Sequence, residues 1–138
     1  MAFAGRNSGP PTVLVIDDET GPREALRMVL KPHFRVLTAN CGEEALATLR
    51  HEKVDVITLD LRMPGFDGVT TLELIREIAP EIGVVVITGF GSRETLMDTV
   101  YLGAFSYMNK PFHVSDVLET VREALERSRR GSGSPATA

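Results

Sequence analysis

The stretch VLVIDDE at residues 13–19 consists of four apolar residues followed at once by three acidic ones. A short, continuous apolar run rich in Val and Ile is typical of a strand that is covered on both faces. The segment ITLDL at residues 57–61 has the same form, because an apolar run again leads into a carboxylate, Asp60. Strands that are buried on both faces occur mainly in parallel sheets, so these two segments favour an α/β fold.

Three further runs of this kind follow along the chain, and segments with helical periodicity separate them. In the second of these segments, Asn40 and Glu43 have the spacing of a capping box at a helix start. Five strand–helix units in succession predict an α/β domain with a five-stranded parallel sheet and right-handed crossovers. The expected strands are 13–16, 34–38, 54–59, 84–87 and 104–108.

The composition is that of one ordinary globular domain. The 138 residues are 43% hydrophobic and 25% charged, and Cys41 is the only cysteine, which excludes an internal disulfide. Residues 12–125 contain 11 Lys and Arg against 18 Asp and Glu, a balance of −7 that disfavours nucleic-acid binding.

No apolar run reaches the length of a membrane span and no signal peptide is visible, so we expect a cytoplasmic protein. We expect a disordered arm at 1–11, a domain at 12–127 and a flexible tail or linker at 128–138.

Polar side chains follow four of the five expected strands. All strands of a parallel sheet end at one edge, where ligands bind. Three carboxylates at contact distance need a cation, and a hard divalent ion such as Mg²⁺ prefers oxygen ligands. Together with a hydroxyl and an ammonium group, they indicate phosphoryl-transfer chemistry. The residues concerned are Asp17, Asp18, Asp60, Thr88 and Lys110.

Each of these residues also has a structural interpretation when it is considered alone. The Asp17-Asp18 pair could cap a helix, Thr88 could simply end a strand, and Lys110 could be a solvated surface lysine. Their joint occurrence at the ends of several strands favours a common site, because otherwise several independent coincidences would be required.

The chain resembles the receiver (CheY-like) domain of bacterial two-component response regulators over about residues 12–127. The motifs that carry the resemblance are VLVIDDE at 13–19, ITLDLRMPGFDG at 57–68, VVVITGFG at 84–91 and LGAFSYMNKPF at 102–112. The resemblance implies a doubly wound, flavodoxin-like sheet of order 2-1-3-4-5 with five helices.

The same resemblance implies that Asp60 accepts a phosphoryl group from a histidine kinase or a phosphotransfer protein. Asp17 and Asp18 would hold Mg²⁺ (or Mn²⁺) together with Asp60 and the backbone carbonyl of Arg62. Thr88 and Lys110 would bind the phosphoryl oxygens.

The resemblance also implies a switch made of Thr88 and Tyr107. Phosphate on Asp60 is expected to draw the Thr88 hydroxyl inward, after which Tyr107 turns from solvent into the vacated space. This movement would change the surface of helix 4, strand 5 and helix 5, which could also mediate homodimerisation. On this interpretation the protein is not a turnover enzyme and catalyses only its own phosphorylation and dephosphorylation, with no nucleic acid or membrane bound by this domain.

Two other functions compete with this interpretation. A small aspartyl-phosphate phosphatase would use Asp17 as its nucleophile, but such enzymes need an Asp-x-Asp pair, and here Asp17 and Asp18 are adjacent. A pseudo-receiver that binds its partner constitutively usually lacks one of the residues present here. The carboxylate that becomes phosphorylated distinguishes a receiver from the phosphatase: it is Asp60 in a receiver and Asp17 in the phosphatase.

Overall fold

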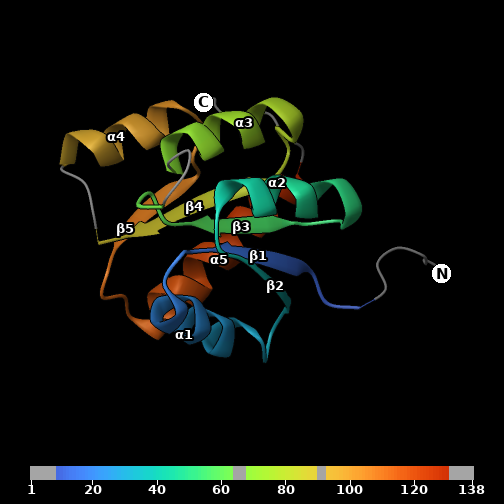
Figure 1. Ribbon diagram of the computed structural model, residues 1–138. Helices are drawn as coiled ribbons and strands as arrows, with labels where there is room; N and C mark the ends of the chain where they lie inside the picture. The colour runs from blue at the N-terminus through green and yellow to red at the C-terminus, as the bar shows by residue number, and fades with distance from the viewer. Residues whose placement is uncertain (1–8, 64–67, 90–92, 131–138) are drawn as a thin grey trace.

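The structure is a computed structural model that describes residues 9–63, 68–89 and 93–130. It contains a five-stranded parallel sheet in the order β2-β1-β3-β4-β5, with helices on both faces (Figure 1). The fold class, strand order and parallel pairing predicted from the sequence are therefore confirmed. The strands are β1 (Thr12–Ile16), β2 (Arg35–Ala39), β3 (Val56–Leu59), β4 (Gly83–Thr88) and β5 (Ser106–Asn109).

Each strand is followed by a helix, so the chain alternates strictly between the two kinds of element. Helices α1 and α5 cover one face of the sheet, and α2, α3 and α4 cover the other (Figure 1). The helices are α1 (Thr20–Leu30), α2 (Gly42–His51), α3 (Gly68–Ile78), α4 (Arg93–Tyr101) and α5 (Val114–Arg129). None of the helices in the described parts of the chain is long and apolar enough to cross a membrane.

Two hydrophobic clusters, one on each face, hold these layers together. Leu14 and Ile57 belong to the cluster beneath α2 and α3, whereas Val15 and Val85 belong to the cluster beneath α1 and α5. Alternate residues of a strand point to opposite faces, so a central strand must be apolar at every position to bury both sides. This requirement explains why β1 and β3 are continuously or nearly continuously apolar and completely buried.

Several element boundaries differ from the sequence prediction. β3 begins at Val56 rather than at residue 54, and the Asp55 carboxylate accepts a hydrogen bond from the Thr12 backbone N–H at 2.8 Å. β5 begins at Ser106 rather than at residue 104, because the Ala104 N–H donates to the Thr99 carbonyl and closes the end of α4. Residues 1–8 of the expected arm (1–11) and residues 131–138 of the expected tail (128–138) lie outside the described residues, so the expected domain boundaries stay predictions.

The expected capping box at the start of α2 is wrong. Cys41, not Asn40, is the N-cap residue, and its side chain makes no cap hydrogen bond. The acidic side chain that returns to the helix start is that of Glu44, whose Oε1 accepts a hydrogen bond from the Asn40 N–H at 2.7 Å. The helix therefore begins one residue later than the capping-box spacing indicated, and of the two side-chain hydrogen bonds of a capping box only the one to an acidic side chain has a counterpart here.

Candidate functional site

The sheet brings the predicted site residues to one edge, at the carboxyl ends of β1, β3, β4 and β5. Backbone hydrogen bonds beyond the strands hold these residues in place. The Asp60 N–H donates to the Ile16 carbonyl at 3.0 Å, and the Lys110 N–H donates to the Thr88 carbonyl at 3.0 Å. The sheet ladder thus continues into the residues that carry the polar side chains, which fixes their positions relative to one another.

Asp60 lies at the centre of this site, and its side chain is almost completely buried. One carboxylate oxygen, Oδ1, accepts hydrogen bonds from the Thr88 hydroxyl at 2.6 Å and from the Arg62 backbone N–H at 3.1 Å. The other oxygen, Oδ2, lies 3.1 Å from the ammonium nitrogen of Lys110. Both oxygens are therefore hydrogen-bonded, by the last residue of β4 and by the loops that follow β3 and β5.

Lys110 also pairs with Asp17, whose Oδ2 is 2.7 Å from Nζ. Burial raises the pKa of the Asp17 carboxyl, although the hydrogen bonds from Lys110 and from the Glu19 N–H oppose this effect. Burial alone would lower the pKa of Lys110, but its hydrogen bonds to Asp17 and Asp60 outweigh burial and raise it. The Lys110 ammonium group thus pairs with two buried carboxylates. These contacts do not fully offset the effect of burial on Asp17, so its pKa stays raised.

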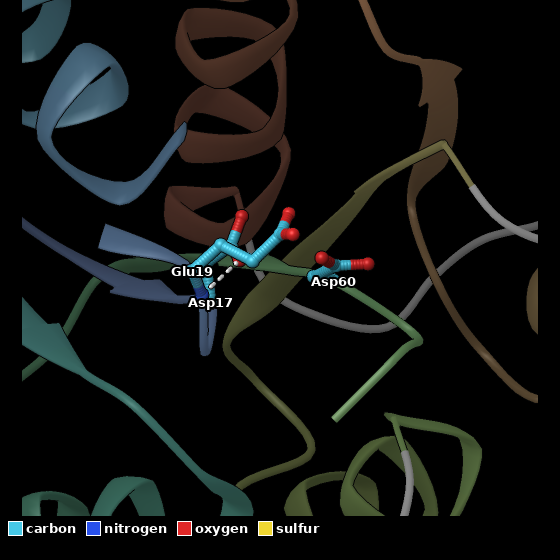
Figure 2. A group of neighbouring side chains, drawn as sticks. All are labelled: Asp17, Glu19 and Asp60. Atoms are coloured by element: carbon cyan, nitrogen blue, oxygen red, sulfur yellow. Dashed lines mark hydrogen bonds between the residues drawn. The ribbon is translucent and has the colours of Figure 1, made fainter. Parts of the chain in front are cut away.

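An acidic cluster forms at this point from Asp17, Glu19 and Asp60, which Figure 2 shows side by side. One carboxylate oxygen from each residue lies within 4.8 Å of the others. The Glu19 backbone N–H donates to Asp17 Oδ1 at 3.0 Å, which ties the start of α1 to the cluster. A set of carboxylate oxygens is the donor set that a hard divalent cation prefers, so these residues could bind a metal.

The membership of the cluster differs from the expectation in one position. The structure does not bring Asp18 into the cluster, and its side chain lies exposed on the loop after β1. Glu19, which the sequence prediction did not select, takes the third place. The only sequence signal for Glu19 is that it completes the acidic run after β1.

Arg23 is a second residue that sequence reasoning missed. Its guanidinium donates to the Asp17 backbone carbonyl at 3.0 Å and to the Thr20 hydroxyl at 3.4 Å. It therefore links the first turn of α1 to the loop that carries the acidic residues. A partly buried arginine in an amphipathic helix has no sequence feature that would reveal this contact.

The two expected switch residues lie on neighbouring strands. Thr88 ends β4, and Tyr107 in β5 is half-buried against the hydrophobic cluster beneath α2 and α3. The expected first step, in which phosphate on Asp60 draws the Thr88 hydroxyl inward, stays a prediction. That hydroxyl already donates to the unmodified Asp60 carboxylate. The glycine-containing segment after Gly89, at residues 90–92, lies outside the described residues.

Comparisons with known proteins agree on one family. The family model described as the response regulator receiver domain matches residues 13–122. The hydrogenase transcriptional regulatory protein HoxA of Cupriavidus necator is 44% identical over 116 residues, which is 83% of this chain and 24% of that protein. The transcriptional regulatory protein ZraR of Salmonella typhimurium is 33% identical over 122 residues, 88% of this chain and 28% of that protein. The chain thus spans about a quarter of the length of these relatives.

Solved structures also resemble the chain. A response regulator receiver domain protein from Clostridium thermocellum has a TM-score of 0.81 at 29% identity, covering 87% of this chain and 98% of that chain. NtrX from Brucella abortus, solved in complex with ADP, has a TM-score of 0.83 at 30% identity, covering 88% of this chain and 28% of that chain.

Proposed function

Because this chain belongs to the response regulator receiver family, we propose that it is a phosphorylation-controlled switch in which Asp60 is the phosphoacceptor. The donor is the phospho-histidine of a histidine kinase or a phosphotransfer protein. A carboxylate oxygen of Asp60 attacks phosphorus, the P–N bond breaks, and the histidine nitrogen leaves with the bonding electron pair and takes up a proton. The product is an acyl phosphate on Asp60.

The single observation that supports this proposal is the surroundings of Asp60. Its carboxylate lies between the Thr88 hydroxyl and the Lys110 ammonium group, which are at hydrogen-bond distance from opposite oxygens. After transfer, the same two groups can donate to phosphoryl oxygens, because Thr88 ends β4, the strand next to β3, and Lys110 directly follows β5. Stabilisation of charge on the equatorial oxygens is the main task of a protein in phosphoryl transfer.

Mg²⁺ (or Mn²⁺) is the cofactor that we propose for this site, and it would neutralise charge on the transferring phosphoryl group. The residues that we expect to hold it are Asp17, Asp60 and the backbone carbonyl of Arg62, with Asp18 as the further carboxylate that the family pattern assigns. Among the described residues, Lys110 is the side chain that pairs with both buried carboxylates, and a divalent cation would offset the remaining negative charge. The protein then contributes fixed oxygen ligands rather than a separate catalytic base.

The output surface that we propose consists of α4, β5 and α5. Three large apolar side chains of α4, those of Met97, Val100 and Tyr101, are exposed, and Tyr101 retains 91% of its possible exposure. A pocket of about 360 Å³ between β5 and α5 includes Tyr107 in its lining. An exposed apolar surface next to the switch residue favours a protein partner or a second copy of this chain.

The remaining parts of the proposal follow from this role. The protein acts in the cytoplasm and catalyses no reaction beyond its own phosphorylation and dephosphorylation. This domain itself binds neither nucleic acid nor membrane, since residues 12–125 carry a net charge of −7.

A chemical phosphodonor tests the assignment of Asp60. With Mg²⁺ and a small acyl phosphate or phosphoramidate, we expect one phosphoryl group per chain, attached to Asp60, as measured by intact mass and peptide mapping. The Asp60→Asn variant should take up none, because it lacks the nucleophilic carboxylate. Label on Asp17 would instead identify the phosphatase chemistry, and unchanged label at another residue in Asp60→Asn would contradict the proposal.

A comparison of two neighbouring variants tests the metal ligands. We expect Asp18→Asn to weaken Mg²⁺ binding by at least about tenfold and Glu19→Gln to weaken it less, since removal of a direct carboxylate ligand deletes a charge and a coordination bond. Calorimetric titration with Mg²⁺ measures both affinities. A larger loss for Glu19→Gln would assign the position to Glu19, in agreement with the cluster seen in Figure 2.

A further inference from the structure

Gly68, the first residue of α3, lies directly against the backbone of Asp60 and Leu61. Its N–H donates to the Leu61 carbonyl at 3.0 Å, which closes the connection from residue 61 to residue 68. A Cβ atom at this position would lie 2.7 Å from the Asp60 carbonyl oxygen and still closer to the Leu61 Cα. Both of these atoms belong to the backbone, so no side-chain rotation can make room for a methyl group.

A side chain at Gly68 would displace the backbone by an amount that matters for the hydrogen-bond lengths of Asp60. Ordinary contacts of a Cβ atom begin at 3.4 Å, so a methyl group at Gly68 must move α3 or the Asp60 backbone by several tenths of an ångström or more. The contact from Thr88 Oγ1 to Asp60 Oδ1 is 2.6 Å, and that from Lys110 Nζ to Oδ2 is 3.1 Å. A shift of this size weakens both contacts, because hydrogen bonds depend steeply on distance and angle.

We infer that Gly68 is a positioning residue for phosphoryl transfer: its missing side chain lets α3 pack onto the Asp60–Leu61 backbone and seats the Asp60 carboxylate between Thr88 and Lys110. This inference rests on the proposed function of Asp60. It assigns to Gly68 an effect on the site that differs from a general effect on stability. The Arg62 N–H, which donates to Asp60 Oδ1, belongs to the same segment and reports on its position.

Gly83 provides a matched control at the other end of the sheet. A Cβ atom there would lie 3.2 Å from both the Cβ and the carbonyl oxygen of Ala124 in α5. Gly83 begins β4, whereas Thr88 ends it, so crowding at Gly83 acts on packing away from the phosphorylation site. Gly83→Ala therefore tests what crowding at a glycine does when the Asp60 segment is left in place.

The experiment compares Gly68→Ala and Gly83→Ala with the wild-type chain. For Gly68→Ala we expect phosphorylation by a small acyl phosphate to be about 10- to 100-fold slower, as for a misplacement of about 1 Å at a reacting group. We also expect weaker Mg²⁺ binding and a shifted Arg62 amide resonance in the metal-free protein. For Gly83→Ala we expect a lower Tm, with phosphorylation rate and Mg²⁺ affinity within about twofold of wild type and the Arg62 resonance unmoved.

Two results would overturn the inference. One is a folded Gly68→Ala variant with wild-type rate and Mg²⁺ affinity, and the other is an equal loss in Gly83→Ala. If Gly68→Ala does not fold, amide hydrogen exchange in the wild-type chain decides: the Gly68 amide should be protected and should exchange more slowly with Mg²⁺. Exchange that is fast and indifferent to Mg²⁺ contradicts the inference. A wild-type chain that takes no phosphate at Asp60 refutes the proposed function instead, and the inference with it.

Discussion

Lys110→Met should lower the stability of the metal-free protein at pH 7 more than any other single substitution among the polar residues of the site. Its ammonium group lies 2.7 Å from Asp17 and 3.1 Å from Asp60, and both carboxylates are almost completely buried. Removal of one partner from a buried ion pair costs roughly 3 kcal/mol or more, because the remaining charge stays desolvated. Methionine keeps the apolar stem, so the change isolates the loss of the charge. Thermal unfolding measures the result.

The pH dependence of this variant has a definite sign. Burial already raises the pKa of Asp17 above its ordinary value of 3.8 in the presence of Lys110, and loss of the lysine raises it further. The folded variant then binds a proton more tightly than the unfolded chain. Its stability therefore increases as the pH falls from neutral through the raised pKa towards 3.8, and the deficit relative to wild type shrinks in the same range.

Mg²⁺ and a surface lysine complete the test. A divalent cation supplies the missing positive charge, so Mg²⁺ should raise the Tm of Lys110→Met by more than it raises the Tm of wild type. Lys53→Met is the matched control, because Lys53 pairs with Asp55 at 3.2 Å but its side chain is 85% exposed. An exposed pair contributes little, so this control should unfold almost as wild type does. Equal stability of Lys110→Met and wild type in metal-free buffer at pH 7 would contradict the role of Lys110 as counter-ion.

Thr88→Ala should separate phosphorylation from its consequence at the α4–β5–α5 surface. The nucleophile remains, so the variant still becomes phosphorylated at Asp60. The hydroxyl that connects Asp60 to the end of β4 is lost, and β4 pairs with β5, which carries Tyr107. Phosphorylation of wild type should strengthen self-association or partner binding by about 5- to 150-fold, the usual range of such couplings. In the variant we expect less than about a twofold change, measured by analytical ultracentrifugation or a binding titration.

Thr58→Val is the control for loss of a strand hydroxyl near the site. Thr58 is also buried, and in the described part of the chain its hydroxyl has no hydrogen-bond partner. Its register partners Val15 and Val85 belong to the cluster beneath α1 and α5, on the face away from Tyr107. Thr58→Val should therefore retain the wild-type coupling. A fully phosphorylated Thr88→Ala variant that couples as strongly as wild type would show that the signal leaves Asp60 by another route.

The amino-acid sequence by itself determined the class of fold and the edge of the sheet, at the carboxyl ends of the strands, where the site lies. A short apolar run rich in Val and Ile, such as Val13–Ile16, is typical of a strand that is buried on both faces, and this signal is local. Because parallel strands end at one edge, Asp17 and Asp60 had to meet wherever their strands were close together. The strand order that the family resemblance implied places β1 beside β3, and the structure confirms it.

Only the tertiary structure decided which atoms touch. Lys110 and Asp17 are 93 positions apart, and their contact depends on the relative placement of β1 and β5, which do not pair with each other. The choice of Glu19 over Asp18 depends on how the loop turns into α1, and the contact of Gly68 with the Asp60 backbone depends on how closely α3 packs on β3. Hydrophobic periodicity specifies which face of an element is buried, but distances of 2.6–3.1 Å between polar atoms result from the packing of all the layers together.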